Sequence, residues 1–194
     1  IIIESNLFNF SEPSIFTIFD SLSSPFLVLI VINPSSTIST GESIIWQSGV
    51  WGILERGVNE KAIGDKRIIN SGIISTKNDL SSDFKTYGIG IWDMTFPSEK
   101  TMTVLNDGII SAYGKKSVAI GFEQEKGTKL NVSSNGIIYS DKGVFSGIDS
   151  IEKIDNNGIL IGNLTNIKDL NNKYTNNGIM FSYDSTNKNY KIQE

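Results

Sequence analysis

The sequence predicts an all-β fold: a right-handed parallel β-helix, or β-solenoid, with coils of roughly 20 to 36 residues and a non-repeating N-terminal cap. Two observations predict it. A Gly-Ile phrase with a polar residue before the glycine recurs along the chain, and Ile and Asn are abundant at 31 and 19 residues. Cys and His are absent. Branched side chains favour pleated strands, and Asn and Gly favour the turns between them. Without disulfides or the usual zinc ligands, stability must come from packing and hydrogen bonds.

The recurring phrase is a turn followed by a short apolar run. Its five copies are Asn70–Ser75, Asn106–Ser111, Ser134–Tyr139, Asn156–Ile161 and Asn176–Phe181. Their glycines, separated by 36, 28, 22 and 20 residues, are Gly72, Gly108, Gly136, Gly158 and Gly178. A period near 20 residues is the size of one solenoid coil, which contributes two or three short strands. Leucine-rich repeats share that period but require a regular Leu spacing, which this region lacks.

Each residue type in the phrase has an expected role. Gly, with Asn before it, supplies the positive backbone dihedrals of a sharp corner. If coils stack about 4.8 Å apart, equivalent polar residues lie above one another and bond along the stack. The expected ladder is Ser71, Asp107, Asn135, Asn157 and Asn177. One of the two apolar files fills the core, such as Ile73, Ile109, Ile137, Ile159 and Ile179, and the pattern leaves open which file points inward.

Other β-like runs lie between the phrases and are expected to form the remaining faces of each coil. They are Tyr87–Trp92, Thr101–Leu105, Ser117–Phe122, Lys129–Val132 and Gly143–Ile148. The chain therefore divides into repeats over residues 41–185 and a polar tail over residues 186–194. Residues 1–40 lack the phrase, and we expect them to cap the first coil or to be disordered.

Composition and charge argue against nucleic acid, cofactors and metal ions as ligands. The net charge is −4, from 17 basic and 21 acidic residues, and no run of Lys or Arg is long enough to follow a phosphate backbone. We therefore expect no nucleic-acid partner. We also expect no cofactor and no metal, because the acidic spacing between Asp141 and Glu152 lacks the oxygen ligands of a calcium loop.

Candidate chemistry is limited to aromatic residues and carboxylates. The aromatic residues of one stretch are Trp46, Trp51, Tyr87, Trp92 and Phe96. A core or cap at the N-terminal end is their simplest interpretation, and Trp92 and Tyr87 are candidate ligand contacts because such rings stack on sugars or anchor proteins. A polysaccharide-degrading β-helix needs clustered carboxylates, for which the candidates are Asp93, Asp149 and Glu152. Solvated turns explain these carboxylates more simply, so we predict no catalytic residue and no enzyme.

The Asn-Gly-Ile-Ile and Gly-Ile-Gly phrases, at irregular periods over roughly residues 40 to 185, resemble the passenger regions of bacterial autotransporters (type V secretion) and related secreted adhesins. The resemblance implies export across the outer membrane and a structural or adhesive β-helix, at the cell surface or secreted, with a role in virulence. It implies a host-cell surface protein or glycan as partner, and contact with the outer membrane only through a membrane barrel that this chain does not contain.

The sequence therefore leaves three alternative functions open. The first is an adhesive passenger that recognises its partner with loops such as Asn78 to Thr86 and Pro97 to Lys100. The second is a carbohydrate-active β-helix enzyme, a polysaccharide lyase or hydrolase. The third is a phage-type β-helix, which would be trimeric.

Overall fold

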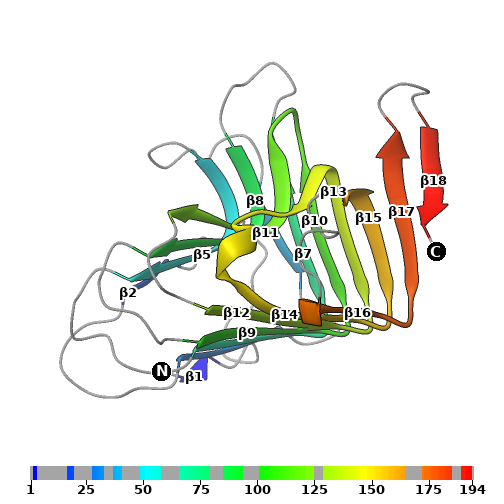
Figure 1. Ribbon diagram of the computed structural model, residues 1–194. Helices are drawn as coiled ribbons and strands as arrows, with labels where there is room; N and C mark the ends of the chain where they lie inside the picture. Colours follow the sequence, from blue (N-terminus) through cyan, green and yellow to red (C-terminus); the bar gives the residue numbers. More distant parts are fainter. Residues whose placement is uncertain are drawn as a thin grey trace.

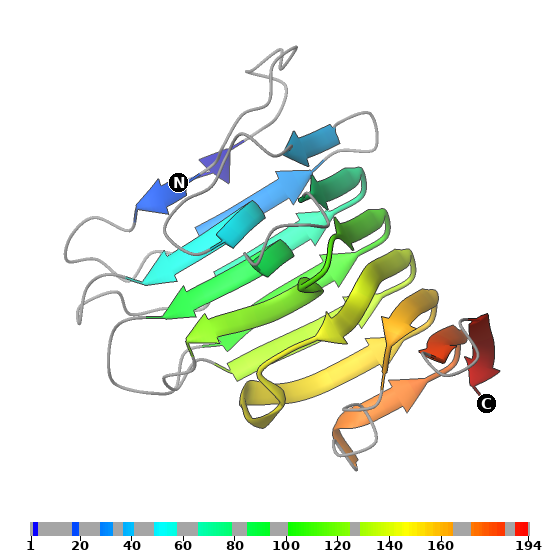
Figure 2. The ribbon, with the colours of Figure 1, turned by 90° about the horizontal axis from the view of Figure 1, so that it is seen from above.

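The computed structural model describes residues 2–3, 17–19, 28–32, 37–40, 49–57, 66–78, 85–93, 101–124, 129–164, 172–184 and 189–193. In these residues the structure confirms the predicted all-β fold, a parallel β-helix whose strands pair from coil to coil (Figure 1). Seen from above, successive coils lie side by side along one axis, from the N-terminal to the C-terminal end (Figure 2). The strands form two sheets, and the second sheet bends into two faces.

The first face is a seven-stranded parallel sheet. Its strands, in order along the sheet, are β1 (Ile2–Ile3), β3 (Val28–Ile32), β6 (Lys66–Asn70), β9 (Thr101–Asn106), β12 (Lys129–Ser134), β14 (Ile151–Asn156) and β16 (Tyr174–Asn176). Residues alternate in burial along β9, with Met102 and Val104 buried and Thr103 partly exposed. This period of two places one side of the sheet in the core.

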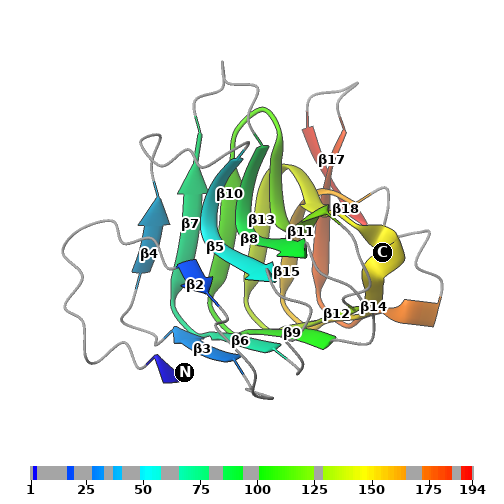
Figure 3. The same ribbon diagram turned by 90° about the vertical axis from the view of Figure 1, so that its left-hand side faces the viewer.

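The second face continues from the turn phrase. Its parallel strands are β4 (Thr37–Thr40), β7 (Ile73–Lys77), β10 (Ile109–Tyr113), the first half of β13 (Ile137–Phe145), β15 (Ile159–Asn163) and β17 (Ile179–Asp184) (Figure 3). The pairing places every phrase Ile opposite its equivalent, as in Ile109 with Ile137 and Ile137 with Ile159. The recurring phrase is therefore the start of the second face in each coil from β7 onward.

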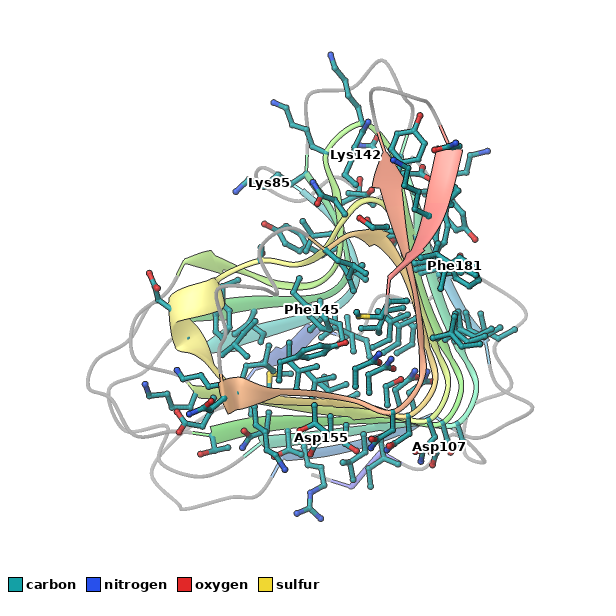
Figure 4. All side chains as sticks on the ribbon, turned by 45° about the vertical axis from the view of Figure 1, so that its right-hand side comes forward. Lys85, Asp107, Lys142, Phe145, Asp155 and Phe181 are labelled. Carbon is teal, nitrogen blue, oxygen red and sulfur yellow. The ribbon has the colours of Figure 1, made fainter. Side chains whose placement is uncertain are left out.

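The third face returns the chain toward the first. Its strands are β2 (Thr17–Phe19), β5 (Gly49–Gly57), β8 (Lys85–Asp93), β11 (Ser117–Gln124) and the second half of β13. A short 3-10 helix, η2 (Ile148–Ser150), precedes β14. Phe145 from this face lies in the interior between the faces (Figure 4).

The structure determines which apolar file fills the core. The inward file on the second face, with relative exposures of 0, 0, 0, 0 and 7%, is Ile74, Ile110, Ile138, Leu160 and Met180. The file beginning at Ile73 points outward, and Ile73 and Ile179 are 37% and 47% exposed. Full burial of an Ile side chain contributes about 1.5–3 kcal/mol, so the inward file is a continuous source of stability along the axis.

A buried polar ladder follows the apolar core at the corner between the first and second faces. Its members are the last residues of first-face strands: Asn70, Asn106, Ser134, Asn156 and Asn176. Asn70 Nδ2 donates to Asn106 Oδ1 at 2.7 Å, and Asn106 Nδ2 donates to Ser134 Oγ at 3.0 Å. Asn156 Nδ2 donates to Asn176 Oδ1, also at 2.7 Å. Buried amides need such partners, and these three bonds supply them between the coils that they join.

Parallel strand pairing also occurs within residues 1–40, which were expected to cap the first coil or to be disordered. Strand β3 pairs in parallel with β6, and β4 pairs with β7, so Thr37 lies opposite Ile73. Strands β1 and β2 pair in turn with β3 and β5. The glycine phrase is absent here, and β3 is instead a continuous apolar run of five residues. The rest of residues 1–40 lies outside the described residues.

The end of the chain is also structured. Strand β18 (Asn189–Gln193), within the expected polar tail, pairs antiparallel with β17. Phe181 lies opposite Ile192, and Tyr183 lies opposite Tyr190. An antiparallel strand covers the second-face edge of β17 and ends the parallel stack on that face.

Candidate binding surface

The turn glycines form one file, with each glycine packed against the glycine of the preceding coil. A Cβ added at Gly136 would lie 2.0 Å from the carbonyl oxygen of Gly108, and one at Gly158 would lie 2.0 Å from that of Gly136. The corresponding distance for Gly108 and for Gly178 is 2.1 Å. No side chain fits at that spacing.

This close approach corrects the reason expected for the glycines. Among the described glycines, positive φ values occur at Gly114, Gly147 and Gly162, and not in the turn file. The turn glycines are therefore required because the backbones of neighbouring coils nearly touch, and not because the corner needs a left-handed residue.

The polar ladder expected from the sequence lies on the outside of the same corner. Asn135 Nδ2 donates to Asp107 Oδ1 at 2.7 Å, and Asn157 Nδ2 donates to Asn135 Oδ1 at 3.2 Å. Asn177 Nδ2 continues the series to Asn157 Oδ1 at 3.0 Å. These bonds are exposed, so they compete with water and contribute less than the buried ladder.

Tyr87 and Trp92, the candidate ligand contacts, lie on β8. Tyr87 is only 1% exposed and its hydroxyl donates to the Phe122 carbonyl at 3.5 Å. A ring buried to this extent cannot stack on a ligand, so the structure assigns Tyr87 to the interior. The backbone of Trp92 pairs with Arg56 of β5, and its side chain lies outside the described residues.

A different set of aromatic residues is gathered on the outer surface of the second face. We name it the aromatic face, and its members are Tyr113, Tyr139, Ile161, Phe181, Tyr183, Tyr190 and Ile192. Phe181 points away from the interior (Figure 4). Tyr190 and Ile192 are 44% and 68% exposed. The aromatic face is thus a partly exposed apolar surface across neighbouring coils.

Two ring pairs organise the aromatic face. The Tyr113 and Tyr139 ring centroids lie 5.0 Å apart, and those of Tyr183 and Tyr190 lie 5.2 Å apart with an edge-to-face geometry. The Tyr139 hydroxyl donates to Asp141, whose second carboxylate oxygen accepts from the Gly114 backbone N–H at 2.8 Å. Burial raises the pKa of Tyr139, and the hydrogen bonds to Asp141 and Tyr190 raise it further. Tyr139 is therefore a neutral donor, and its ring is held in place.

Lysines from separate segments meet at the corner between the second and third faces, beside the aromatic face. We name this group the lysine ridge: Lys77, Lys85, Lys115, Lys116 and Lys142, all exposed. Backbone pairing brings them together, because Lys77 lies opposite Tyr113 and the Thr86 N–H donates to the Lys116 carbonyl at 3.2 Å. The Lys142 N–H donates to Ser117 Oγ at 3.1 Å. Lys85, at the start of β8, and Lys142, within β13, lie at the end of the molecule where the second and third faces meet (Figure 4).

The expected carboxylates and loops show no comparable gathering in the described part of the chain. Asp149 and Glu152 are exposed, and Glu152 lies 3.9 Å from Lys129 Nζ. The side chain of Asp93 and residues 79–84 and 97–100 lie outside the described residues, while Asn78 and Thr86 are buried. No group of three metal-ligating side chains occurs among the described residues. Within the same residues, no helix has the length and apolar character needed to cross a membrane.

Sequence reasoning missed both the aromatic face and the lysine ridge, although a signal was present. Counting five residues from each turn glycine gives one row of the second face: Lys77, Tyr113, Asp141, Asn163 and Tyr183. Counting three residues gives the next row: Ser75, Ser111, Tyr139, Ile161 and Phe181. Aligning the coils on their glycines, instead of reading the chain linearly, brings these side chains together.

Comparisons with protein-family models, with curated proteins and with solved structures found no match for this chain.

Proposed function

We propose that the protein is a non-catalytic β-helical scaffold, displayed at a bacterial cell surface or secreted, that adheres to a host-cell surface protein or glycan through the aromatic face. The observation that carries this proposal is the partial exposure of aromatic and aliphatic side chains across β10, β13, β15, β17 and β18. Exposed apolar patches rimmed by polar groups are typical of interaction sites, and Tyr is enriched at binding contacts.

The resemblance to autotransporter passengers supports the cellular setting. In a β-helix each coil contacts only its neighbours, so the identity of outward-facing residues can differ from coil to coil without disturbing the core. The outward row three residues after the turn glycine runs from Ser75 and Ser111 to Tyr139, Ile161 and Phe181. Such a change from polar to apolar along one row is what a local binding surface on a uniform scaffold would require.

Adhesion of coated beads tests the proposal. Beads carrying the full chain should bind cultured epithelial cells, and the double variant Tyr190→Ser/Ile192→Ser should reduce the number of bound beads at least fivefold. The matched control is Lys153→Ser/Thr175→Ser, two exposed positions on the outer surface of the first face. Adhesion no better than that of albumin-coated beads, or equal losses in both variants, would contradict the proposal.

A further inference from the structure

We infer that Asn177 and Gly178, in the turn before β17, form a site of spontaneous deamidation, where the protein converts its own asparagine side chain into aspartate or isoaspartate. The inference goes beyond the proposed function, because it does not depend on what the aromatic face binds. It rests on the Asn-Gly pair, on the exposure of Asn177 and on the hydrogen bonding of the Gly178 N–H.

Three turns of the second face carry the same reactive sequence, an exposed Asn followed by Gly and Ile. Their asparagines are Asn135, Asn157 and Asn177. Asparagine is thermolabile, and a following glycine has no side chain to hinder the approach of its nitrogen to the asparagine side chain. Close contact between coils excludes any larger residue from the glycine file. The fold therefore retains the reactive pair in all three turns, which makes them direct controls for one another.

The reaction needs only water and mild base. The Gly178 nitrogen gives its proton to hydroxide and bonds to Asn177 Cγ, while the bond from Cγ to Nδ2 breaks and ammonia leaves. Water then opens the resulting succinimide ring. Addition of water at Cγ gives aspartate, and addition at the backbone carbonyl carbon gives isoaspartate. One water is consumed and one ammonia is released, without any oxidation or reduction.

Hydrogen bonds hold the attacking nitrogen in the two preceding turns. The Gly136 N–H donates to the Asn106 carbonyl at 3.0 Å, and the Gly158 N–H donates to the Ser134 carbonyl, also at 3.0 Å. An N–H that donates in this way keeps its proton and its position until the local structure opens. These two turns are therefore protected in the folded protein.

The last turn lacks this protection. The Asn177 N–H donates to the Asn156 carbonyl at 2.8 Å, but within the described residues the Gly178 N–H has no acceptor. Gly178 is also partly exposed, whereas Gly158 is buried. The nitrogen that must lose its proton is thus accessible to solvent base only at the end of the series.

The side chain of Asn177 is also the least restrained of the three. Asn157 donates to Asn135 Oδ1 at 3.2 Å and accepts from Asn177 Nδ2 at 3.0 Å, so it is held from both sides. Asn177 ends the outer ladder and is held from one side in the described structure. Rotation of its Cγ toward the Gly178 nitrogen therefore breaks a single exposed bond.

The two products affect the last coil differently. Aspartate at position 177 adds a negative charge and cannot donate to Asn157 Oδ1, which removes an exposed bond. Isoaspartate also lengthens the backbone beside Gly158, where neighbouring coils nearly touch. Isoaspartate should therefore disturb the start of β17 more than aspartate does.

Peptide mass spectrometry of the full chain, incubated in mildly alkaline buffer, tests the inference. In the folded protein, deamidation at Asn177 should be at least fivefold faster than at Asn135 or Asn157. In urea, the three sites should react at rates within twofold of one another, because their local sequences are alike. Equal rates in the folded protein, faster reaction at Asn135 or Asn157, or an unreactive Asn177 would overturn the inference.

Hydrogen exchange measured by NMR separates the missing bond from opening of the whole coil. The Ile179 N–H donates to the Gly158 carbonyl at 2.9 Å, so it should exchange at least tenfold more slowly than the Gly178 N–H. Similar exchange at both positions would show that the last coil opens as a unit, and the assigned cause would be wrong.

Two glutamine variants complete the test. Asn177→Gln should abolish most of the mass change of the intact folded protein, because the longer side chain would have to close a larger ring. Asn135→Gln is the matched control and should leave the mass change intact. The same loss in both variants would contradict the assignment to Asn177.

Discussion

At the scale of the residue, the turn glycines are fixed by backbone contact between coils. Gly158 packs so closely on Gly136 that an added methyl group would overlap a carbonyl oxygen, and backbone atoms cannot move aside as a flexible side chain can. Gly143 offers a contrast on the same scaffold, because a Cβ there would meet its nearest neighbour at 3.6 Å. Substitution by Ala is therefore expected to destabilise the protein at Gly158 and to have little effect at Gly143.

Gly158→Ala should lower the free energy of unfolding by about 1–3 kcal/mol or more, the usual cost of forcing extra volume into a packed site. Gly143→Ala should change it by less than about 0.5 kcal/mol. Urea denaturation followed by circular dichroism measures both. Equal stability of the two variants would show that the glycine file is not in contact between coils.

The two polar ladders differ in burial and so in their expected contributions. Asn156 is 1% exposed, donates to Asn176 and accepts from the Gly158 N–H at 3.2 Å, whereas Asn157 is exposed. Asn156→Ala should therefore destabilise the protein by about 1–3 kcal/mol, because it leaves buried groups unpaired. Asn157→Ala is the control and should cost less than about 0.5 kcal/mol. A reversed order in thermal melts would contradict the assignment of the inner ladder.

Two partly buried tyrosines predict a loss of stability in alkali. Burial raises the pKa of Tyr174 from 10.0 to about 12, and the pKa of Tyr139 is also raised. The unfolded chain loses these protons first, so the stability they contribute is fully present below pH 10 and falls as the pH rises toward 12. Tyr174→Phe should make the fall between these pH values shallower. If urea titrations of the variant show an unchanged dependence of stability on pH, the raised pKa of Tyr174 is contradicted.

At the scale of the element, β18 is the feature that ends the second face. It pairs antiparallel with β17 through residues 189–193 and covers hydrogen-bonding groups that another strand would otherwise meet. Deletion of residues 186–194 should therefore cause self-association, measured by sedimentation velocity. The control variant Ile192→Ser keeps the strand and removes only an exposed side chain, so this variant should self-associate no more than the unmodified protein. A truncated chain that remains dispersed would show that β18 does not protect the edge.

The second-face strands from β7 onward were the most predictable elements, because each follows its own copy of the turn phrase. Strands β3 and β4 were missed because no glycine precedes Thr37, although β4 pairs with β7 in the same register. The inward and outward files were left open because both files are aliphatic, so period-two alternation does not distinguish them.

At the scale of the whole molecule, the surface was less predictable than the fold. The fold depends on a phrase that recurs locally, whereas the aromatic face and the lysine ridge depend on register between coils of unequal length. Lys77 and Lys142 are 65 positions apart, and only stacking places them at one corner. Tyr87 was expected to be a candidate ligand contact but is buried. The sequence pattern alone does not distinguish an outward-facing ring from a buried one.

Stacking of adjacent coils is the central claim, and the absence of cysteine allows a direct test of it. Asn135 and Asn157 lie at equivalent positions of neighbouring coils, and Asn177 lies at the same position one coil further. Neighbouring positions about 4.8 Å apart are within the 4.4–6.8 Å range of Cα separations for a disulfide, whereas positions two coils apart, at about 9.6 Å, are not.

The measurement is intramolecular disulfide formation under mild oxidation in two double variants, read by mass spectrometry of the monomer. Asn135→Cys/Asn157→Cys should cross-link fully in the folded state, and Asn135→Cys/Asn177→Cys should stay reduced. Cross-linking of the second pair instead of the first, or of neither pair, would contradict the stacked-coil architecture and the surfaces built on it.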